Sequence, residues 1–487
     1  MSKQFEIPEE VKAIARELAR AGFEAYLVGG CVRDVLLGRE PKDWDIATNA
    51  TPDIVQKIFP ESVYENSFGT VGIKTGSENP KLKIVEVTTF RIEGKYTDKR
   101  HPDEVTFAKT IEEDLSRRDF TVNAMAVSLN NGEEIVDPYG GQGDLEAKII
   151  RTVGNPEERF SEDALRLMRA VRFATELGWE IELETRRAAE KLSGLLEMIA
   201  KERVRDEFIK IVMTPRASDG INTLEQLNIL RNVVPELREG IGVGQNKHHI
   251  YTVFEHNVRA LRYTADQNYP LDVRLASLLH DVGKPRSKRG EGSNSTFYGH
   301  EYIGAKMTLG ILDRLHFPKD FTERVAHLVR SHMFYYNVGE VSAAGVRRFL
   351  ARVGVENIDD VMKVREADRI GSGVPKAVVY KMRHLLFMID KVRRDPVSAK
   401  MLAVRGEDVM RIANIPPSLK VGQILAALLE EVLEDTAKNT KEYLEKRTIE
   451  LAKLPDKKLA ELKESSRKTK DEFEAGEEEE IKKKHHV

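Results

Sequence analysis

The sequence predicts a multidomain α+β protein, in which a small mixed α/β domain at the N-terminus is followed by domains made of helices. A chain of 487 residues is too long for one hydrophobic core and suggests roughly three or four domains. From residue 25 to residue 136, short apolar runs rich in β-branched residues alternate with turns, which is typical of a small sheet. Beyond the Asp-Pro-Tyr-Gly-Gly turn at 137–141, a plausible hinge, apolar residues recur at helical spacing.

Composition limits the classes of function. The 77 Lys and Arg residues nearly balance the 80 Asp and Glu residues, giving a net charge of −3. Any RNA-binding surface must therefore be a local patch. A single cysteine excludes a disulfide framework and fits a reducing cytosol. The N-terminus lacks a signal-peptide pattern, and no apolar run approaches the ~20 residues that span a bilayer. We expect a soluble, cytoplasmic enzyme with no membrane partner.

The N-terminal elements suit phosphate binding. Residues 8–21 predict an amphipathic helix and 26–28 a short buried strand. Gly29 and Gly30 then allow a tight turn into a helix start, where bare N–H groups and Arg33 make a seat for phosphate. Further strands are predicted over 62–64, 71–75, 82–90 and 125–129.

Two aspartates carry most of the chemical information. Asp43 and Asp45 are one residue apart, so in an extended segment both carboxylates point to the same face. Such a pair suits Mg²⁺, which reaches phosphate substrates through one or two carboxylates. The strand pattern around Glu86 can bring a third carboxylate beside them, as a metal ligand or to help deprotonate an attacking hydroxyl. This combination indicates nucleoside triphosphate chemistry.

Six segments in collinear order carry a family resemblance. The chain resembles the class II tRNA nucleotidyltransferases and bacterial poly(A) polymerases, whose fold implies a nucleotidyltransferase head with a small polymerase-β-like sheet. The segments are Gly-Gly-Cys-Val-Arg-Asp at 29–34, Asp-Trp-Asp at 43–45, Arg-Arg-Asp-Phe-Thr-Val-Asn-Ala-Met-Ala at 117–126, Asp-Pro-Tyr-Gly-Gly at 137–141, Glu-Asp-Ala-Leu-Arg at 162–166 and Glu-Arg-Val-Arg-Asp-Glu-Phe at 202–208.

The resemblance implies roles for these residues. The two aspartates would hold two metal ions, and the RNA 3′-hydroxyl would attack the α-phosphate in line. Arg118, Asp119 and Asn123 would contact the ribose and triphosphate, although Asp119 is also compatible with a simple helix cap.

Asp163 and Arg166 have two readings. Ser161 is a good N-cap residue, and Asp163 and Arg166, three apart, would share a helix face and form an ordinary salt bridge. The resemblance implies instead that they select the incoming base. The aspartate accepts from the exocyclic amino group of cytosine or adenine, and the arginine donates to ring acceptors.

A polar loop at 91–102 bears on the product. By the resemblance, such an element is needed for adding the final A, and enzymes that add only the two C residues tend to lack it. Its presence predicts complete CCA addition or A-only addition and does not separate the two.

A second site is expected from an ordered series of metal-ligand residues. The series resembles the HD-domain metal-dependent phosphohydrolases. His256, His280, Asp281 and Asp368 match the core ligands of that family, and His300 and His332 match a second metal position. Imidazole with carboxylate suits Mn²⁺, Fe²⁺, Ni²⁺ or Co²⁺, and a metal-bound hydroxide could hydrolyse phosphomonoesters or cyclic phosphodiesters. The alternative is a metal-free structural relic.

The remaining predictions concern RNA and domain limits. Residues 374–454 resemble the C-terminal body and tail of CCA-adding enzymes, with phosphate contacts expected from Lys420, Lys438, Lys441 and Arg447. The expected domains are a head at 1–140, a helical neck at 141–242, an HD domain at 243–373, the body and tail at 374–454, and a charged, disordered or solvated helical tail at 455–487.

The leading interpretation is a tRNA nucleotidyltransferase that uses ATP and CTP. The alternatives are an A-only or CC-only enzyme, a bacterial poly(A) polymerase, and a non-catalytic RNA-binding sensor with an HD module. The oligomeric state stays open.

Overall fold

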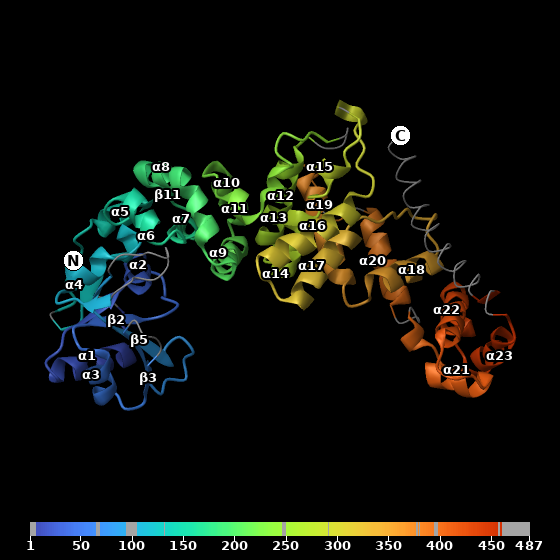
Figure 1. Ribbon diagram of the computed structural model, residues 1–487, viewed down its shortest axis with the longest axis horizontal. Coiled ribbons are helices and arrows are strands. Elements are labelled where there is room, and N and C mark those ends of the chain that lie inside the picture. Colours follow the sequence, from blue (N-terminus) through green and yellow to red (C-terminus); the bar gives the residue numbers. More distant parts are fainter. Residues whose placement is uncertain are drawn as a thin grey trace. The chain divides into compact units, whose positions relative to one another are not determined.

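The computed structural model describes residues 6–64, 69–93, 105–130, 132–245, 250–290, 292–375, 378, 380–393, 398–455 and 458–459. The chain divides into two compact units (Figure 1), one comprising Met1–Arg238 with Arg314–Phe317 and the other Glu239–Asp313 with Pro318–Val487. The multidomain α+β prediction is confirmed, while the finer domain limits stay predictions.

A seven-stranded sheet forms the base of the first unit, in the order β3-β4-β5-β2-β1-β8-β9. Neighbouring strands are antiparallel except for β2 and β5, which run parallel. Each strand predicted from the sequence is present, with ends that differ by at most a few residues. The bounds are β1 Ala25–Val28, β2 Asp45–Thr48, β3 Ser62–Tyr64, β4 Thr70–Lys74, β5 Ile84–Thr89, β8 Ala126–Ser128 and β9 Ile135–Val136.

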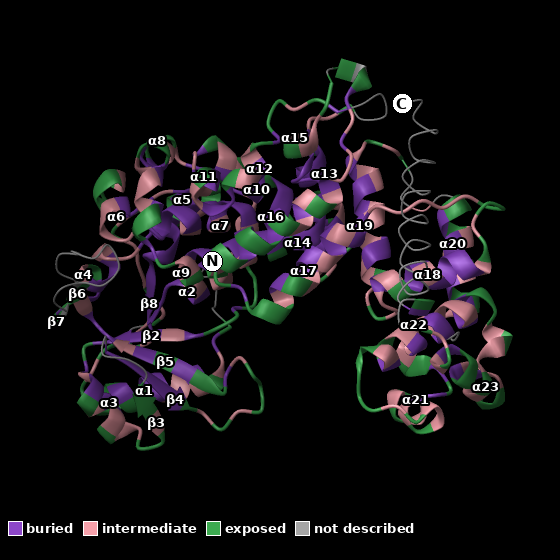
Figure 2. Cartoon of the chain, turned by 45° about the vertical axis from the view of Figure 1, so that its right-hand side comes forward, coloured by how far each residue is buried: buried purple, intermediate pink, exposed green. Residues whose placement is uncertain are grey.

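Apolar side chains bury both faces of this sheet at its central strands β1 and β2. Leu27 and Ile46 pack in one hydrophobic cluster with helices α1 (Glu9–Arg20) and α3 (Pro52–Ile58). Their neighbours Val28 and Ala47 pack in a second cluster with α4 (Ile111–Ser116). In Figure 2, purple segments of β2, β4 and β5 mark their buried residues. Because a slip of one residue would exchange the two faces, this burial fixes the strand register and with it the acidic residues at the start of β2.

Helices make up most of the rest of the first unit. Asp137 begins the predicted hinge segment, and its carboxylate accepts from the N–H groups of Gly141 at 2.7 Å and Gln142 at 2.9 Å, which caps α5. The bounds are α2 Gly30–Leu36, α5 Gly141–Ala147, α6 Pro156–Glu162, α7 Arg166–Leu177, α8 Leu183–Leu192, α9 Lys201–Met213, α10 Ala217–Gln226, α11 Leu230–Val233, α12 Pro235–Arg238 and the 3₁₀ helices η1 Thr121–Asn123 and η2 Ser193–Met198, with small sheets of β6 Arg91–Glu93 with β7 Val105–Phe107 and β10 Ile149–Ile150 with β11 Glu180–Ile181.

The second unit is helical. Its core packs α13 against α14 and α19, and α14 against α17. In the part of the chain that the structure describes, no helix is long and apolar enough to cross a membrane. The bounds are α13 Val253–Asp266, α14 Leu271–Leu279, α15 Lys284–Ser287, η3 Gly292–Asn294, α16 His300–Arg314, α17 Lys319–Ser331, α18 Ala343–Val353, α19 Ile358–Gly371, α20 Tyr380–Val392, η4 Ala399–Met401, α21 Gly406–Ala413, α22 Leu419–Glu434, η5 Thr436–Lys438 and α23 Lys441–Ala452.

Two predicted features fall largely outside the described residues. These are the polar loop at 91–102, beyond its first three residues, and the charged tail at 455–487. The predictions for both stay predictions.

Candidate functional site

The turn from β1 to α2 brings two predicted site residues together. Gly29 has φ 78°, a left-handed conformation that glycine adopts without strain. A Cβ atom on Gly29 would lie 2.9 Å from Arg118 Nη1 and 3.7 Å from Asp45 Oδ2. The glycine therefore allows both an arginine and a carboxylate to approach the start of α2.

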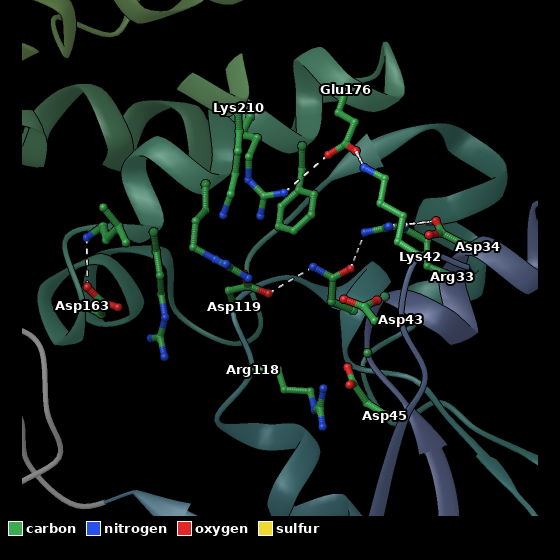
Figure 3. A pocket seen from close by; sticks show the side chains of 18 of the residues that line it. Arg33, Asp34, Lys42, Asp43, Asp45, Arg118, Asp119, Asp163, Glu176 and Lys210 are labelled. Carbon is green, nitrogen blue, oxygen red and sulfur yellow. Dashed lines mark hydrogen bonds and ion pairs between the residues drawn. The ribbon is translucent and has the colours of Figure 1, made fainter. Parts of the chain in front are cut away.

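Asp45 begins β2, and the parallel pairing places it in register with Glu86 of β5. Asp43 lies just before the strand, and both aspartates line one cavity (Figure 3). Burial, together with the carboxylates of Asp43 and Glu86, raises the pKa of Asp45 to about 7. A cation would relieve this crowding of negative charge, and hard oxygen ligands of this kind suit Mg²⁺. The donor set thus fits the metal that the sequence predicts.

A line of polar contacts extends inward from α2. Arg33 donates to the Asp34 carboxylate at 2.8 Å and to Asn123 Oδ1 at 2.9 Å. Asn123 donates in turn to Asp119 at 3.2 Å, and the other oxygen of Asp119 accepts from Arg169 at 2.7 Å. Burial opposes ionisation of Asp119, but Arg169 outweighs it and lowers the pKa of Asp119 to about 2. Three of the predicted nucleotide-binding residues therefore form one connected network.

The helix predicted through Asp163 and Arg166 is broken, which corrects the sequence analysis. Asn155, followed by Pro156 at the first helical position, begins α6. That helix ends at Glu162, so Ser161 lies in its last turn and caps nothing. Asp163 stands between α6 and α7, where its carboxylate accepts from the N–H of Leu165 at 3.0 Å. This local bond competes with helix formation.

The cavity that these residues share has a volume of about 720 Å³. Ten basic and six acidic side chains line it, an excess of positive charge that suits a triphosphate. Phe173 anchors part of the basic wall, since the guanidinium carbons of Arg33, Arg169 and Arg172 lie 5.4, 5.3 and 3.9 Å from its ring centre. The lining residues are Gly29, Gly30, Arg33, Asp34, Lys42, Asp43, Asp45, Arg91, Arg117, Arg118, Asp119, Asn123, Asp163, Leu165, Arg166, Arg169, Arg172, Phe173, Glu176, Arg203 and Lys210.

A second cluster lies in the helical unit, where backbone carbonyls orient the histidines. The Nδ1 atoms of His280, His300 and His332 each lie 2.6–2.7 Å from the carbonyl oxygen three residues earlier. Bonds of this kind fix the tautomer and leave Nε2 available to a metal. Gly283 packs closely against α16, since a Cβ atom on Gly283 would lie 2.2 Å from the His300 carbonyl oxygen. This close packing brings His300 near His280 and Asp281.

All six predicted ligands of this cluster come together. His256, His280, Asp281 and Asp368 form one group, and Asp281, His300 and His332 form another. His256 Nε2 lies 3.1 Å from Asp281 Oδ2 and 3.3 Å from Asp368 Oδ1. Burial opposes a charge on His280, but the two carboxylates outweigh it and raise the pKa of His280 to about 10. The cluster therefore attracts positive charge, and its mixed nitrogen and oxygen donors fit a divalent transition metal.

Comparison with known proteins agrees with both clusters. Residues 25–151 match the poly A polymerase head domain, 178–241 the probable RNA and SrmB-binding site of polymerase A, and 253–372 the HD domain. The A-adding tRNA nucleotidyltransferase of Deinococcus radiodurans is 35% identical over 419 residues, which cover 83% of this chain and 91% of that protein. The CCA-adding enzyme of Enterococcus faecalis is 33% identical over 443 residues, covering 90% and 95%.

This chain belongs to the tRNA nucleotidyltransferase and poly(A) polymerase family.

A solved structure extends the likeness. The CCA-adding enzyme of Bacillus stearothermophilus, in complex with CTP, superimposes with a TM-score of 0.66 at 29% identity, covering 91% of this chain and 96% of that one. The family resemblance and the predicted fold class are thereby confirmed.

The structure also adds residues that the sequence analysis of this family member missed. Arg169 and Arg172 continue the spacing of three from Arg166 along α7, which is a signal that the sequence does contain. Arg203 and Lys210 of α9 complete that wall of the cavity, and Lys42 reaches Glu176 at 2.7 Å.

The four residues predicted to contact RNA lie at or near α22 and α23. Lys441 is exposed, and Lys420 donates to the Leu454 carbonyl oxygen at 3.2 Å. Arg447 lies 2.8 Å from Glu431 and 2.7 Å from Glu450. The charge of Arg447 is therefore already engaged, which makes it a weaker candidate for phosphate contact than Lys438 or Lys441.

Proposed function

We propose that this protein extends tRNA 3′ ends with ATP and CTP, adding CCA or its terminal A. The observation that carries the proposal is the placement of Asp43 and Asp45 inside a cavity with ten basic side chains. These aspartates would hold Mg²⁺, and two such ions, when bound, neutralise the attacking and leaving oxygens of a nucleotidyl transfer. Glu86, next to Asp45 in the sheet, is the nearby group that could accept a proton or support the metal.

The remaining lining residues divide between phosphate and base. Gly29, Gly30, Arg33 and Arg118 border the start of α2, where a triphosphate would find N–H groups and positive charge. Asp163 and Arg166, on the opposite part of the lining, supply an acceptor and donors for the base. A base with the reversed pattern would leave a buried donor or acceptor unpaired, which costs about 1–3 kcal/mol.

Two relatives support different products. The Deinococcus radiodurans protein is named for A addition and the Enterococcus faecalis protein for CCA addition, at 35% and 33% identity. The solved relative is a CCA-adding enzyme in complex with CTP, which favours use of CTP. A poly(A) polymerase is the second candidate, because the matched head and RNA-binding models carry that name.

One experiment separates these products. Purified protein is given tRNAs ending at the discriminator base, at C and at CC, each with CTP, ATP or both. A CCA-adding enzyme extends all three to CCA, whereas an A-adding enzyme extends only the CC end. Unlimited A addition to an oligo(A) primer identifies a poly(A) polymerase. Asp43→Asn with Asp45→Asn should abolish every extension, and extension by this double variant would overturn the proposal.

We further propose a metal-dependent phosphohydrolase activity for the HD domain, acting on phosphate groups at RNA 3′ ends before nucleotide addition. Its support is the convergence of six ligand residues on two overlapping groups. His280→Ala with Asp281→Ala should remove hydrolysis of 2′,3′-cyclic phosphates while nucleotide addition continues. Absence of hydrolysis in the native protein with Mn²⁺, Ni²⁺, Co²⁺ or Fe²⁺ would leave the cluster a structural relic or a sensor.

The same proposal includes the partner and the place of action. Lys420, Lys438, Lys441 and Arg447 would contact tRNA phosphates, so tRNA affinity should fall steeply with salt. A cytoplasmic location is expected, where tRNA and nucleoside triphosphates occur together.

A further inference from the structure

Helix α20 (Tyr380–Val392) displays aromatic side chains on the side that faces solvent. Tyr380 is 63% exposed and Phe387 is 62% exposed. The opposite side of the helix is already buried, and α20 packs against α18. The exposed rings are therefore not the packing face of α20, and large exposed rings of this kind mark an interaction surface. The buried residues are Met382, Leu385, Ile389 and Val392.

Four exposed residues and the half-buried His384 form one continuous stripe. Tyr380, Arg383, His384, Phe387 and Lys391 follow intervals of three and four, so they share a helix face. The ring of His384 lies at the centre, 6.2 Å from the rings of both Tyr380 and Phe387. We call these five residues the α20 stripe.

A contact from a neighbouring segment holds the stripe in place. The hydroxyl of Tyr336 lies 2.5 Å from His384 Nδ1, and the two ring centres are 6.0 Å apart. Tyr336 follows the HD ligand His332 by four residues, which span no more than about 14 Å of chain. The stripe is thus tethered by a short link to the HD cluster of the same unit.

The chemistry of the stripe favours a nucleic acid strand over another protein. Basic side chains alternate with the rings at Arg383 and Lys391, while Lys381 is engaged by Asn337 and Glu340. The acidic residues nearby are Asp390 and Glu340, the latter engaged by Tyr335 and Asn337. Aromatic faces beside cations are the means by which proteins bind single-stranded RNA, because bases stack on rings while cations meet phosphates.

We propose that the α20 stripe binds the single-stranded 3′ end of RNA by base stacking and delivers its terminal phosphate to the HD cluster. This inference rests on the proposed phosphohydrolase activity and assigns single-stranded RNA ends, rather than free nucleotides, as its substrate class.

The first test measures binding without catalysis. Full-length protein in EDTA is titrated into a fluorescein-labelled single-stranded RNA 12-mer ending in a 2′,3′-cyclic phosphate, and anisotropy gives Kd. Stacking contributes about 1–3 kcal/mol per base, so Tyr380→Ala and Phe387→Ala should each raise Kd by about 5- to 100-fold. Tyr380→Trp keeps a stacking face and should restore binding. The control is Leu419→Ala, which alters an 87% exposed apolar residue of α22 and should leave Kd unchanged.

The second test separates the stripe from the hydrolytic chemistry. With Mn²⁺ or Ni²⁺, Tyr380→Ala should raise KM for the 12-mer and leave its kcat unchanged. Hydrolysis of 2′,3′-cyclic AMP, which has no adjoining nucleotides to stack along the stripe, should not change. Loss of both activities to the same extent would show that the substitution damages the HD domain, and would overturn the proposal.

Two further outcomes distinguish the possible failures. RNA binding that depends on the stripe, together with no hydrolysis of any substrate, would support the RNA surface and overturn the phosphohydrolase proposal. Unchanged RNA binding in both alanine variants would overturn the stripe proposal and leave the hydrolase open. If sedimentation velocity shows a native dimer that Phe387→Ala dissociates while RNA affinity is unchanged, a second copy of the chain occupies the stripe and the proposal is wrong.

Discussion

Asp163 is paired with Arg203, with Oδ2 and Nη2 3.1 Å apart. Arg166, the other residue predicted to read the base, is paired with Glu162 at 2.6 Å and donates to the backbone carbonyls of Arg159 and Arg117. The two side chains are therefore oriented by different parts of the structure. Asp163 depends on α9, whereas Arg166 depends on the end of α6 and the segment after α4. Each can be perturbed separately.

We predict that Arg203→Ala weakens base selection more than it weakens triphosphate binding. Loss of a bond to a charged group costs about 1.5–3 kcal/mol, so kcat/KM for ATP and CTP should fall by about 10- to 100-fold. Incorporation of UTP and GTP, which do not use Asp163 productively, should fall less. The measurement is single-nucleotide extension with each of the four triphosphates.

The matched control for Arg203→Ala is Arg187→Ala, which breaks an exposed i,i+3 pair with Glu184 on α8. It should leave all four rates unchanged. An equal fall for all four nucleotides in Arg203→Ala would show that Arg203 acts on the triphosphate and not through Asp163.

We predict that Asp45→Asn stabilises the metal-free protein at alkaline pH while abolishing nucleotide addition. The pKa of Asp45 is raised from 3.8 to about 7, so the folded state holds the proton more tightly than the unfolded state does. Native stability is therefore lost as pH rises from about 4 to about 7. Each pKa unit corresponds to about 1.4 kcal/mol. The free energy of unfolding of Asp45→Asn should therefore exceed that of the native protein by up to about 4 kcal/mol above pH 7, and the two should be equal below pH 4.

Calorimetric unfolding in EDTA at pH 4 to 8 checks this prediction. Glu86→Gln, which removes one neighbouring charge, should shift stability in the same direction by a smaller amount. Mg²⁺ should stabilise the native protein more at pH 8 than at pH 6, because the metal competes with the proton, and it should not stabilise Asp45→Asn. A variant less stable than the native protein at pH 8 in EDTA contradicts the assigned charge crowding.

Much of the candidate site could be predicted from the sequence because its signals are local. A strand followed by Gly29-Gly30 has few alternatives to a tight turn. The alternating strand around Glu86 indicated that this residue could lie beside the aspartates, and the sheet register pairs it with Asp45. The candidate HD ligands were predicted from their order along the chain and its resemblance to the HD-domain phosphohydrolases, and the structure brings all six together.

Two features could not be predicted from the sequence. One is which of two competing helix-start signals begins the helix, and the other is which surface residues tertiary packing brings together. Ser161 looks like an N-cap residue, but a helix already begins at Pro156 with Asn155 as its N-cap. Asp163 therefore lies between the end of α6 and the start of α7. The basic wall formed by Arg169 and Arg203 consists of residues that look like ordinary helix surface. They come to line the same cavity only because α7 packs against α9.

We predict that Gly283→Ala damages the HD cluster. Its Cβ would lie 2.2 Å from the His300 carbonyl oxygen and 2.5 Å from the Gly304 nitrogen, and backbone atoms cannot turn aside as a side chain can. Helix α16 must therefore shift and take His300 with it. Overpacking of this kind costs about 1–3 kcal/mol, and Ni²⁺ or Mn²⁺ affinity, measured by titration calorimetry, should fall at least about tenfold.

Gly310→Ala is the control for Gly283→Ala, since Gly310 lies in α16, the helix that Gly283 contacts, with open space around its Cβ position. It should stabilise the protein by about 0.5–1 kcal/mol, because alanine is the better helix former. Unchanged metal affinity in Gly283→Ala would mean that α16 moves without displacing its histidine.

Cys31 offers a probe of the head that needs no mutation, because it is the chain's single cysteine. It lies at the start of α2 with no exposed surface, and its thiol donates to the Val28 carbonyl oxygen at 3.1 Å. Burial is the main cause that raises the pKa of Cys31 to about 12. Because the reactive form is the thiolate, labelling by Ellman's reagent at pH 8 should proceed only through opening of the head, at least about 1,000-fold slower than in denaturant.

The sulfur of Cys31 also lies 3.9 Å from the Asp45 carbonyl oxygen, so Mg²⁺ with ATP should slow labelling further in the native protein but not in Asp45→Asn. Complete labelling within minutes, at a rate indifferent to Mg²⁺ and ATP, would contradict both the burial of Cys31 and its coupling to the metal site.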